Sequence, residues 1–186
     1  PVRGGVVDKD GCIRGDSTLE KMATLAPAFD ANGTVTAATS SPMTDGAAAL
    51  IVASEDYAKR HNLPILARVK STAVSGIAPE VMGLGPVEAA KKALARAGLT
   101  LADIDIIELN EAFSAQALGV IKELNLDVSK LNLDGGAIAI GHPLGASGAR
   151  IVGKAAQLLA RHNKKYALAT MCIGGGQGVA TILESV

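Results

Sequence analysis

Short apolar segments alternate with segments of helical periodicity along this chain, and this alternation limits the fold more than any other feature. Residues 104–109 form an apolar run typical of a buried strand, whereas residues 145–161 carry the spacing of a long helix. Strands that alternate with helices indicate an α/β sheet layered with helices. A tight glycine-rich loop joins the last two predicted strands, 166–171 and 179–183, so we expect that pair to be antiparallel.

Residues that favour turns and caps mark the ends of further elements. Pro86 and Gly98 flank a predicted helix, since proline suits the first helical turn and glycine suits the position after the last. Ser54 is expected to cap a short helix, and the apolar run 47–53 before it predicts a buried strand. Alternation over residues 67–72 predicts another strand.

Composition excludes several classes of protein. The 186 residues suffice for one domain, or for one domain and part of a second. A formal net charge of zero gives no electrostatic basis for binding nucleic acid or an anionic membrane. No apolar run approaches the roughly 20 residues that cross a bilayer. Cys12 and Cys172 are too few for a disulfide framework and lack metal-ligand spacing, so we expect the cytoplasm and no bound metal.

Three segments break the pattern of ordinary packing, and each is expected at the end of a strand, where α/β folds gather their sites. The first begins at Asn110, between the strand 104–109 and a predicted helix over 111–124. Asparagine is a leading helix N-cap residue as well as a polar group suited to catalysis, and this segment alone allows either role.

His142 and Cys172 mark the other two segments. Glycines on both sides of His142 let the backbone approach a ligand closely, and Pro143 stiffens the turn that aims the imidazole. Cys172 enters a run of glycines whose amides are able to bind an oxyanion or a thioester carbonyl. A cysteine at a strand end is otherwise a small buried hydrophobic residue.

Taken in order, these segments resemble the thiolase family. They read NEAF at 110–113, GHP at 141–143 and CIG at 172–174, with SPMTDGAAA upstream at 41–49. The resemblance covers essentially the whole chain. It implies a thiolase-like layered α/β fold, with a mixed five-stranded sheet covered by helices and the tail of a loop domain. It also implies that the nucleophilic cysteine is absent, because that residue lies in the family's amino-terminal half and Cys12 does not match its motif.

The resemblance implies CoA-dependent cleavage of a 3-oxoacyl-CoA to acetyl-CoA and a shortened acyl-CoA, or the reverse condensation. Cys172 would protonate the acetyl-CoA enolate and deprotonate the CoA thiol. His142 would activate the missing nucleophile and donate to the thioester oxygen, while Asn110 would hold a water in that oxyanion hole. The amide of Gly174 would belong to a second hole. CoA and acyl-CoA are expected as substrates, with no permanently bound cofactor.

Further residues match family positions that contact CoA. They are Ser41 and Ala37 for the pantetheine, Arg14 and Phe29 for the nucleotide, and Met82 and Phe113 for the acyl wall. For two of them an interpretation without a role in CoA binding stays open. Arg14 would then be an exposed charge and Met82 a core methionine.

The same likeness divides the chain into three parts. Residues 1–42 would be the tail of a CoA-binding loop domain, residues 43–66 a strand and helix returning to the first core domain, and residues 67–186 the carboxy-terminal core domain. The start at Pro1, without an initiator methionine or signal-peptide pattern, favours a piece of something longer. The implied partner is an amino-terminal half that carries the nucleophile, within a homodimer or homotetramer.

Several functions remain open at this point. A 3-ketoacyl-CoA thiolase of fatty-acid breakdown and an acetoacetyl-CoA-specific biosynthetic thiolase share every motif here. A related condensing enzyme of the same fold should lack the cysteine-glycine motif. The chain alone is expected to be inactive, which leaves a non-catalytic fragment or subunit as a further reading. Asn110, His142 and Cys172 should converge on one pocket.

Overall fold

A four-stranded mixed sheet forms the centre of the structure, a computed structural model that describes residues 4–186. Its strands are β1 (Arg68–Gly76), β2 (Ile106–Leu109), β3 (Tyr166–Ile173) and β4 (Gln177–Glu184), in the spatial order β1-β4-β3-β2. β2 and β3 are parallel, whereas β4 is antiparallel to both β3 and β1. The expected antiparallel pairing of the last two strands is confirmed.

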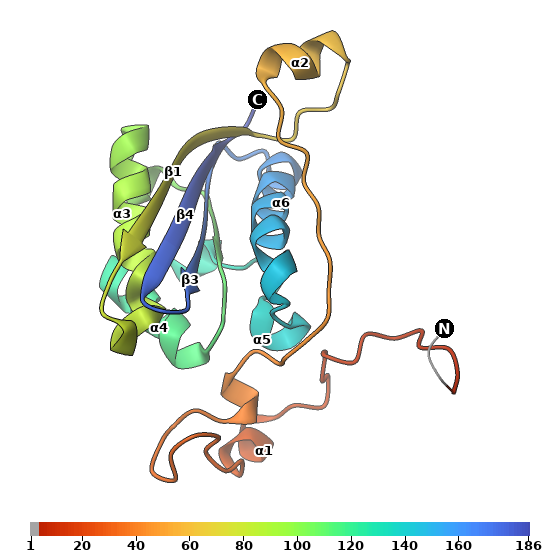
Figure 1. Cartoon of the computed structure of the whole chain (residues 1–186), viewed down its shortest axis with the longest axis vertical. Coiled ribbons are helices and arrows are strands. Elements are labelled where there is room, and N and C mark those ends of the chain that lie inside the picture. The colour runs from red at the N-terminus through yellow and green to blue at the C-terminus, as the bar shows by residue number, and fades with distance from the viewer. Residues whose placement is uncertain (1–3) are drawn as a thin grey trace.

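Helices cover both faces of this sheet (Figure 1). α3 (Gly85–Ala97) and α4 (Ser114–Leu124) lie on one face, and α6 (Leu144–His162) lies on the other. Each face has its own apolar core, built largely from alanine, leucine and isoleucine. The layered α/β architecture expected from the sequence is therefore confirmed.

Strand β2 divides its side chains between the two cores. Ile107 and Leu109 pack in the core beneath α3 and α4, whereas Ile106 packs in the core beneath α6. Because side chains two positions apart on a strand point to the same face, Glu108 and Asn110 also face α6. One buried strand thus carries two polar groups toward the longest helix.

Helix ends follow the cap signals of the sequence. Gly98 ends α3 in the left-handed conformation, with φ of 68°. The Ser54 hydroxyl accepts a hydrogen bond from the Tyr57 amide at the start of α2 (Glu55–Arg60). The remaining helical elements are short: α1 (Leu19–Ala23), α5 (Ala137–Ile140) and the 3-10 turns Ala37–Thr39, Pro79–Leu84, Leu101–Asp103 and Val128–Lys130.

The sheet has four strands instead of the expected five, and at the β2 edge it continues only as a single bridge. Leu131 pairs in parallel with Ile107. Beyond it the side chain of Asn132 takes the place of a backbone ladder, since it accepts from the Leu109 amide and donates to the Leu109 carbonyl, each at 2.9 Å. The expectation of five strands is wrong for this reason.

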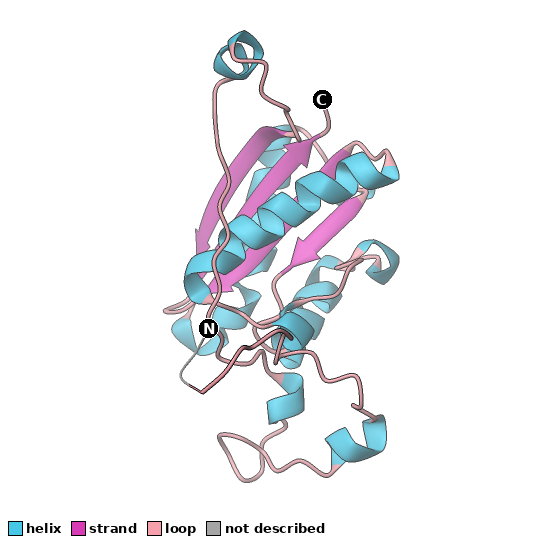
Figure 2. Cartoon of the chain, turned by 90° about the vertical axis from the view of Figure 1, so that its right-hand side faces the viewer, coloured by secondary structure: helices cyan, strands magenta, loops and turns pink. Residues whose placement is uncertain are grey.

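The strand expected at residues 47–53 is also wrong for the described structure. This segment is extended but belongs to no strand of the sheet. It runs past α6 (Figures 1 and 2), where Leu50 lies against Gly153. Ile51 is 89 % exposed and Val52 is 82 % exposed. An apolar run forms a strand only where a neighbouring strand completes its backbone hydrogen bonds, and none within residues 4–186 does so.

The segment expected as a loop-domain tail is largely irregular. Over residues 4–42 it holds only α1 and the turn Ala37–Thr39, and most of its side chains are exposed. Residues 1–3 of that expected segment lie outside the described residues.

Candidate active site

A cavity of about 770 Å³ opens where β3 ends, next to the start of α6. Its walls come from five separate parts of the chain: residues 41–44, the turn before α3, the loop before α4, the loop leading into α6, and the end of β3. The lining residues are Ser41, Pro42, Met43, Thr44, Met82, Ala112, Phe113, His142, Leu144, Met171, Cys172, Ile173 and Gly174. His142 and Cys172 therefore face one cavity, although thirty positions separate them in the sequence.

His142 stands two residues before α6 and is oriented by the first turn of that helix. Its Nδ1 atom lies 2.6 Å from the hydroxyl oxygen of Ser147, which is fully buried. The same hydroxyl donates to the carbonyl of Pro143 at 3.0 Å. When the hydroxyl gives its one hydrogen to Pro143, Nδ1–H is the donor in the first contact. Neutral His142 then carries its lone pair on Nε2, the arrangement a general base needs.

The loop that carries His142 is packed against the upstream segment. Gly141 has φ of 93°, and a Cβ added there would come within 2.5 Å of the Thr44 hydroxyl. A Cβ at Gly46 would come within 2.6 Å of the Pro143 ring. Only glycine allows these close approaches, so the two sequence motifs lie against each other.

Glu111 holds the same loop from the other side. Its carboxylate accepts from the Asn132 side-chain amide at 2.8 Å and from the backbone amide of Ile138 at 3.2 Å. A Cβ at Gly136 would overlap this carboxylate. Glu111 thus positions the loop that leads to His142.

Cys172 is buried near the end of β3 and forms no disulfide. Burial raises the pKa of its thiol above the usual value, and a backbone hydrogen bond offsets part of that rise. The thiol is therefore protonated at neutral pH, which suits it to donate a proton. Gly174 follows in the turn to β4 and also lines the cavity. Burial and the positive charge of Arg150 lower the pKa of His142, so the neighbouring imidazole is neutral at the same pH.

Asn110 does not line the cavity as described. It is fully buried, and its backbone amide donates to the carbonyl of Thr170 on β3 at 3.0 Å. Its Oδ1 accepts from Arg150 on α6 at 3.3 Å, while its Nδ2 has no hydrogen-bond partner among the described residues. The capping interpretation is wrong, because α4 begins at Ser114 with Phe113 as its N-cap.

The residues expected to contact CoA fall into two groups. Ser41, Met82 and Phe113 line the cavity, and Ser41 is fixed there by two contacts to the Ala112 carbonyl, each at 3.0 Å. The others lie outside that lining: Arg14 and Ala37 are exposed, and Phe29 is 80 % exposed with its ring edge-on to Phe113 at 6.4 Å.

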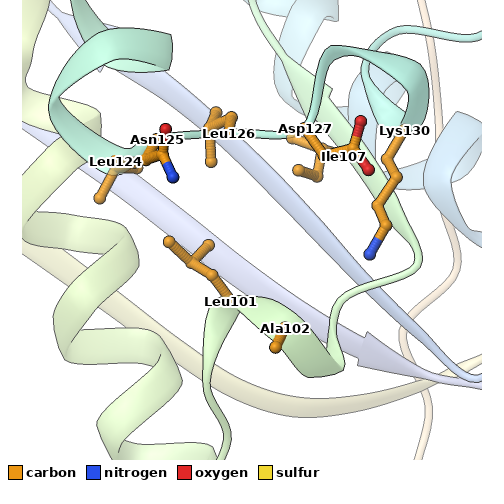
Figure 3. Close-up of a pocket in the computed structure, with 8 residues that line it drawn as sticks. All are labelled: Leu101, Ala102, Ile107, Leu124, Asn125, Leu126, Asp127 and Lys130. Carbon is orange, nitrogen blue, oxygen red and sulfur yellow. The ribbon is translucent and has the colours of Figure 1, made fainter.

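A second, smaller hollow of about 310 Å³ lies beside β2 and α4 (Figure 3). Its charged groups already have partners: Lys130 donates to the Ile104 carbonyl at 2.7 Å, and Asp127 accepts from Ser129. It therefore presents mainly apolar side chains and no cluster of reactive groups. No helix among residues 4–186 is long and apolar enough to span a bilayer.

Sequence reasoning assigned no role to four polar residues near the site: Glu108, Glu111, Ser147 and Arg150. Ser147 contacts His142 and Arg150 contacts Asn110. Glu111 holds the loop before His142, and Glu108 acts on Arg150 through its charge. One of them carried a visible signal, since Glu108 is an acidic residue inside an otherwise apolar strand. The others lie on a loop or helix where their polarity is ordinary.

Comparison with known families identifies two matching regions. A family model described as "Thiolase, C-terminal domain" matches residues 63–185, and one described as "Thiolase, N-terminal domain" matches residues 2–56. The chain is similar to the 3-ketoacyl-CoA thiolase of Pseudoalteromonas translucida, at 55% identity over 97% of this chain and 48% of that protein. It spans about half the length of the curated relatives it matches.

Solved structures give the same picture. Human mitochondrial 3-ketoacyl-CoA thiolase in complex with CoA is 47% identical, with a TM-score of 0.89 over 95% of this chain and 45% of that one. The Bacillus anthracis acetyl-CoA acetyltransferase is 44% identical, with a TM-score of 0.93 over 96% of this chain and 45% of that one.

Proposed function

The chain belongs to the thiolase family, and from this premise we propose that it supplies the acid/base half of a CoA-dependent acyltransferase site. The proposed reaction is thiolytic cleavage of 3-oxoacyl-CoA to acetyl-CoA and a shortened acyl-CoA, or the reverse condensation. The observation that carries the proposal is that His142 and Cys172 face one cavity, with a neutral imidazole and a protonated thiol.

Each residue has a role that fits its surroundings. Cys172 protonates the departing acetyl-CoA enolate and later takes the proton of the incoming CoA thiol. His142 accepts the proton of the nucleophilic cysteine at Nε2 and then donates to the thioester oxygen. Asn110 binds a water beside that oxygen through Nδ2, and the amide of Gly174 contributes to a second oxyanion site. CoA and acyl-CoA act as substrates, and no bound cofactor takes part.

We propose that CoA contacts the same residues that the sequence indicated. Ser41, Met82 and Phe113 support this assignment by lining the cavity. Ala37, Arg14 and Phe29 are proposed to contact the longer CoA chain outside it, where their exposure leaves them accessible.

We propose that the nucleophilic cysteine comes from an amino-terminal half that precedes these residues in the assembled enzyme. The apolar segment 47–53 supports this, because Ile51 and Val52 are exposed. Adjacent exposed apolar side chains of this kind mark surfaces that another part of a protein covers. In this division residues 1–42 belong to a CoA-binding loop domain, residues 43–66 to the first core domain, and residues 67–186 to the second.

Relatives named 3-ketoacyl-CoA thiolase, at 54% to 57% identity, support the broader 3-ketoacyl substrate over an acetoacetyl-CoA-specific one. Their name also supports a place in fatty-acid breakdown. A homodimer or homotetramer in the cytoplasm completes the proposal, and the two free cysteines are consistent with a reducing compartment.

The test is complementation. The chain alone should not cleave acetoacetyl-CoA or a longer 3-ketoacyl-CoA, whereas joining it to the amino-terminal half of the Pseudoalteromonas relative should produce CoA-dependent cleavage. Steady turnover by the pure chain, abolished by Cys12→Ala, would refute the division of the site. An inactive but folded joined protein would favour a non-catalytic role.

A further inference from the structure

We propose that Arg150 is a positioning residue: its guanidinium fixes the side-chain amide of Asn110 so that Nδ2 remains free to bind a water or a substrate oxygen. The inference rests on the proposed function and adds to it a residue outside the cavity lining. It starts from the contact between Arg150 Nη2 and Asn110 Oδ1 at 3.3 Å.

The chemistry of the two side chains sets the direction of the amide. A guanidinium has five donors and no acceptor, so only the oxygen of an asparagine amide is able to face it. Because the amide is planar, Nδ2 then points away from Arg150. A neutral or acidic residue at position 150 would allow the opposite orientation.

The free donor is the second observation. Asn110 is 0% exposed, yet Nδ2 has no partner among the described residues. Burying a donor without a partner destabilises the folded chain. Nδ2 therefore requires a hydrogen-bond acceptor from outside the chain, and an ordered water can be that acceptor.

Glu108 explains why an arginine is held at this depth. Its carboxyl group is 1% exposed and faces α6 from the same side of β2 as Asn110. The opposite charges of Glu108 and Arg150 act on each other within this face. Arg150 is therefore coupled by charge to a buried carboxyl, while its guanidinium contacts the amide that it orients.

A double-mutant cycle tests the proposal in the chain joined to the amino-terminal half of its relative. Arg150→Met should lower kcat about ten-fold or more with little change in KM, since a loosened oxyanion donor acts on the transition state. Asn110→Ala should lower kcat further. If Arg150 acts through Asn110, combining both changes should cost no more than Asn110→Ala alone. Fully additive losses would overturn the proposal.

A charge-balanced variant separates positioning from support of the fold. Arg150→Met leaves Glu108 without its counter-charge, whereas Glu108→Gln/Arg150→Met removes both charges together. A purely structural arginine predicts that this double variant recovers kcat, which would contradict the proposal. Lys154→Met is the matched control, because it removes a cation one turn further along α6 that pairs with Asp134 and acts on Glu108 less than Arg150 does. Its kcat should equal that of the parent.

A measurement without turnover keeps this inference distinct from the proposed function. In the ¹⁵N-labelled chain, the side-chain amide signals of Asn110, identified by their loss in Asn110→Ala, should shift in Glu108→Gln/Arg150→Met and stay unchanged in Lys154→Met. Unchanged signals in the double variant would overturn the inference. If the joined protein lacks thiolysis while these signals behave as expected, the proposed function fails and the Arg150–Asn110 link stands.

Discussion

The Nδ1 atom of His142 lies 2.6 Å from the Ser147 hydroxyl oxygen, and that oxygen also lies 3.0 Å from the Pro143 carbonyl oxygen. A hydroxyl that gives its only hydrogen to Pro143 holds the imidazole in the tautomer with Nδ1–H. Arg150 acts on His142 through its charge. We infer that Ser147 sets which ring nitrogen carries the proton.

Ser147→Ala should release that tautomer. Histidine ¹⁵N shifts should show a protonated Nδ1 and an unprotonated Nε2 in the parent at pH 8, and a mixture of tautomers in the variant. Loss of the buried hydroxyl should also cost about 1–3 kcal/mol of stability. Ser129→Ala, at an exposed hydroxyl, should change neither quantity. A parent with protonated Nε2 would contradict the assignment.

Cys172→Ala tests whether the thiol carries protons or only fills space. In the joined protein it should cost about 1 kcal/mol of stability, because it removes one small buried group. Turnover should fall about a hundred- to ten-thousand-fold, the usual contribution of general acid/base catalysis. Cys172→Ser keeps the shape but offers a hydroxyl too weakly acidic to replace the thiol, so it should be equally impaired.

Two results would give Cys172 a packing role instead: near-normal turnover of the serine variant, or an unfolded alanine variant that serine rescues in fold and rate. Acylation by a reactive thioester that needs no enolate protonation should fall much less than turnover. Cys12→Ala, a change outside the cavity, should leave turnover at the level of the parent.

Glu108 should make the stability of the chain depend on pH. Burial raises the pKa of its carboxyl group from 4.5 to about 7, against the opposing charge of Arg150. The folded state therefore binds more protons than the unfolded state between these values, so the free energy of unfolding falls as the pH rises from 4.5 to about 7. The expected loss is about 3 kcal/mol, and it is complete above that window.

Urea unfolding at a series of pH values measures this effect. Glu108→Gln should remove most of the slope between pH 5 and pH 7, whereas Glu123→Gln, at an exposed site on α4, should keep the slope of the parent. Equal slopes in the parent and in Glu108→Gln would show that the Glu108 carboxyl does not titrate in this window.

Local signals predicted the helices better than the strands. Pro86, Gly98 and Ser54 act through the conformation of neighbouring residues, and the helices they mark are present. The run 47–53 failed because a strand depends on a partner far away in the sequence or outside it. The helix expected from residue 111 begins at Ser114, since the residues before it bridge to Ser40 and Ser41.

The site was predicted only in part for a related reason. Motifs of unusual backbone, rich in glycine and proline, led to His142, Cys172 and Gly174, which line one cavity. Ser147 and Arg150 were passed over because a serine and an arginine on a helix are ordinary residues. Ser147 reaches His142 through the turn that begins α6, and Arg150 reaches Asn110 only when α6 packs on the sheet. The catalytic roles of His142, Cys172 and Gly174 stay predictions.

The exposed segment 47–53 gives the last prediction. Ile51 is 89% exposed in this chain, so Ile51→Lys should change its stability by no more than about 0.5 kcal/mol, as is usual for surface substitutions. If the amino-terminal half covers this segment, the same change should bury an unpaired charge there, which is costly. When the two halves are mixed as separate chains, Ile51→Lys should therefore weaken their association at least ten-fold and lower the recovered thiolysis to match.

Val128→Lys is the matched control: Val128 is 66% exposed but lies in a turn distant in sequence from the segment. Titration calorimetry or analytical ultracentrifugation measures the association directly. Equal association of the Ile51→Lys and Val128→Lys chains would show that the amino-terminal half does not cover residues 47–53.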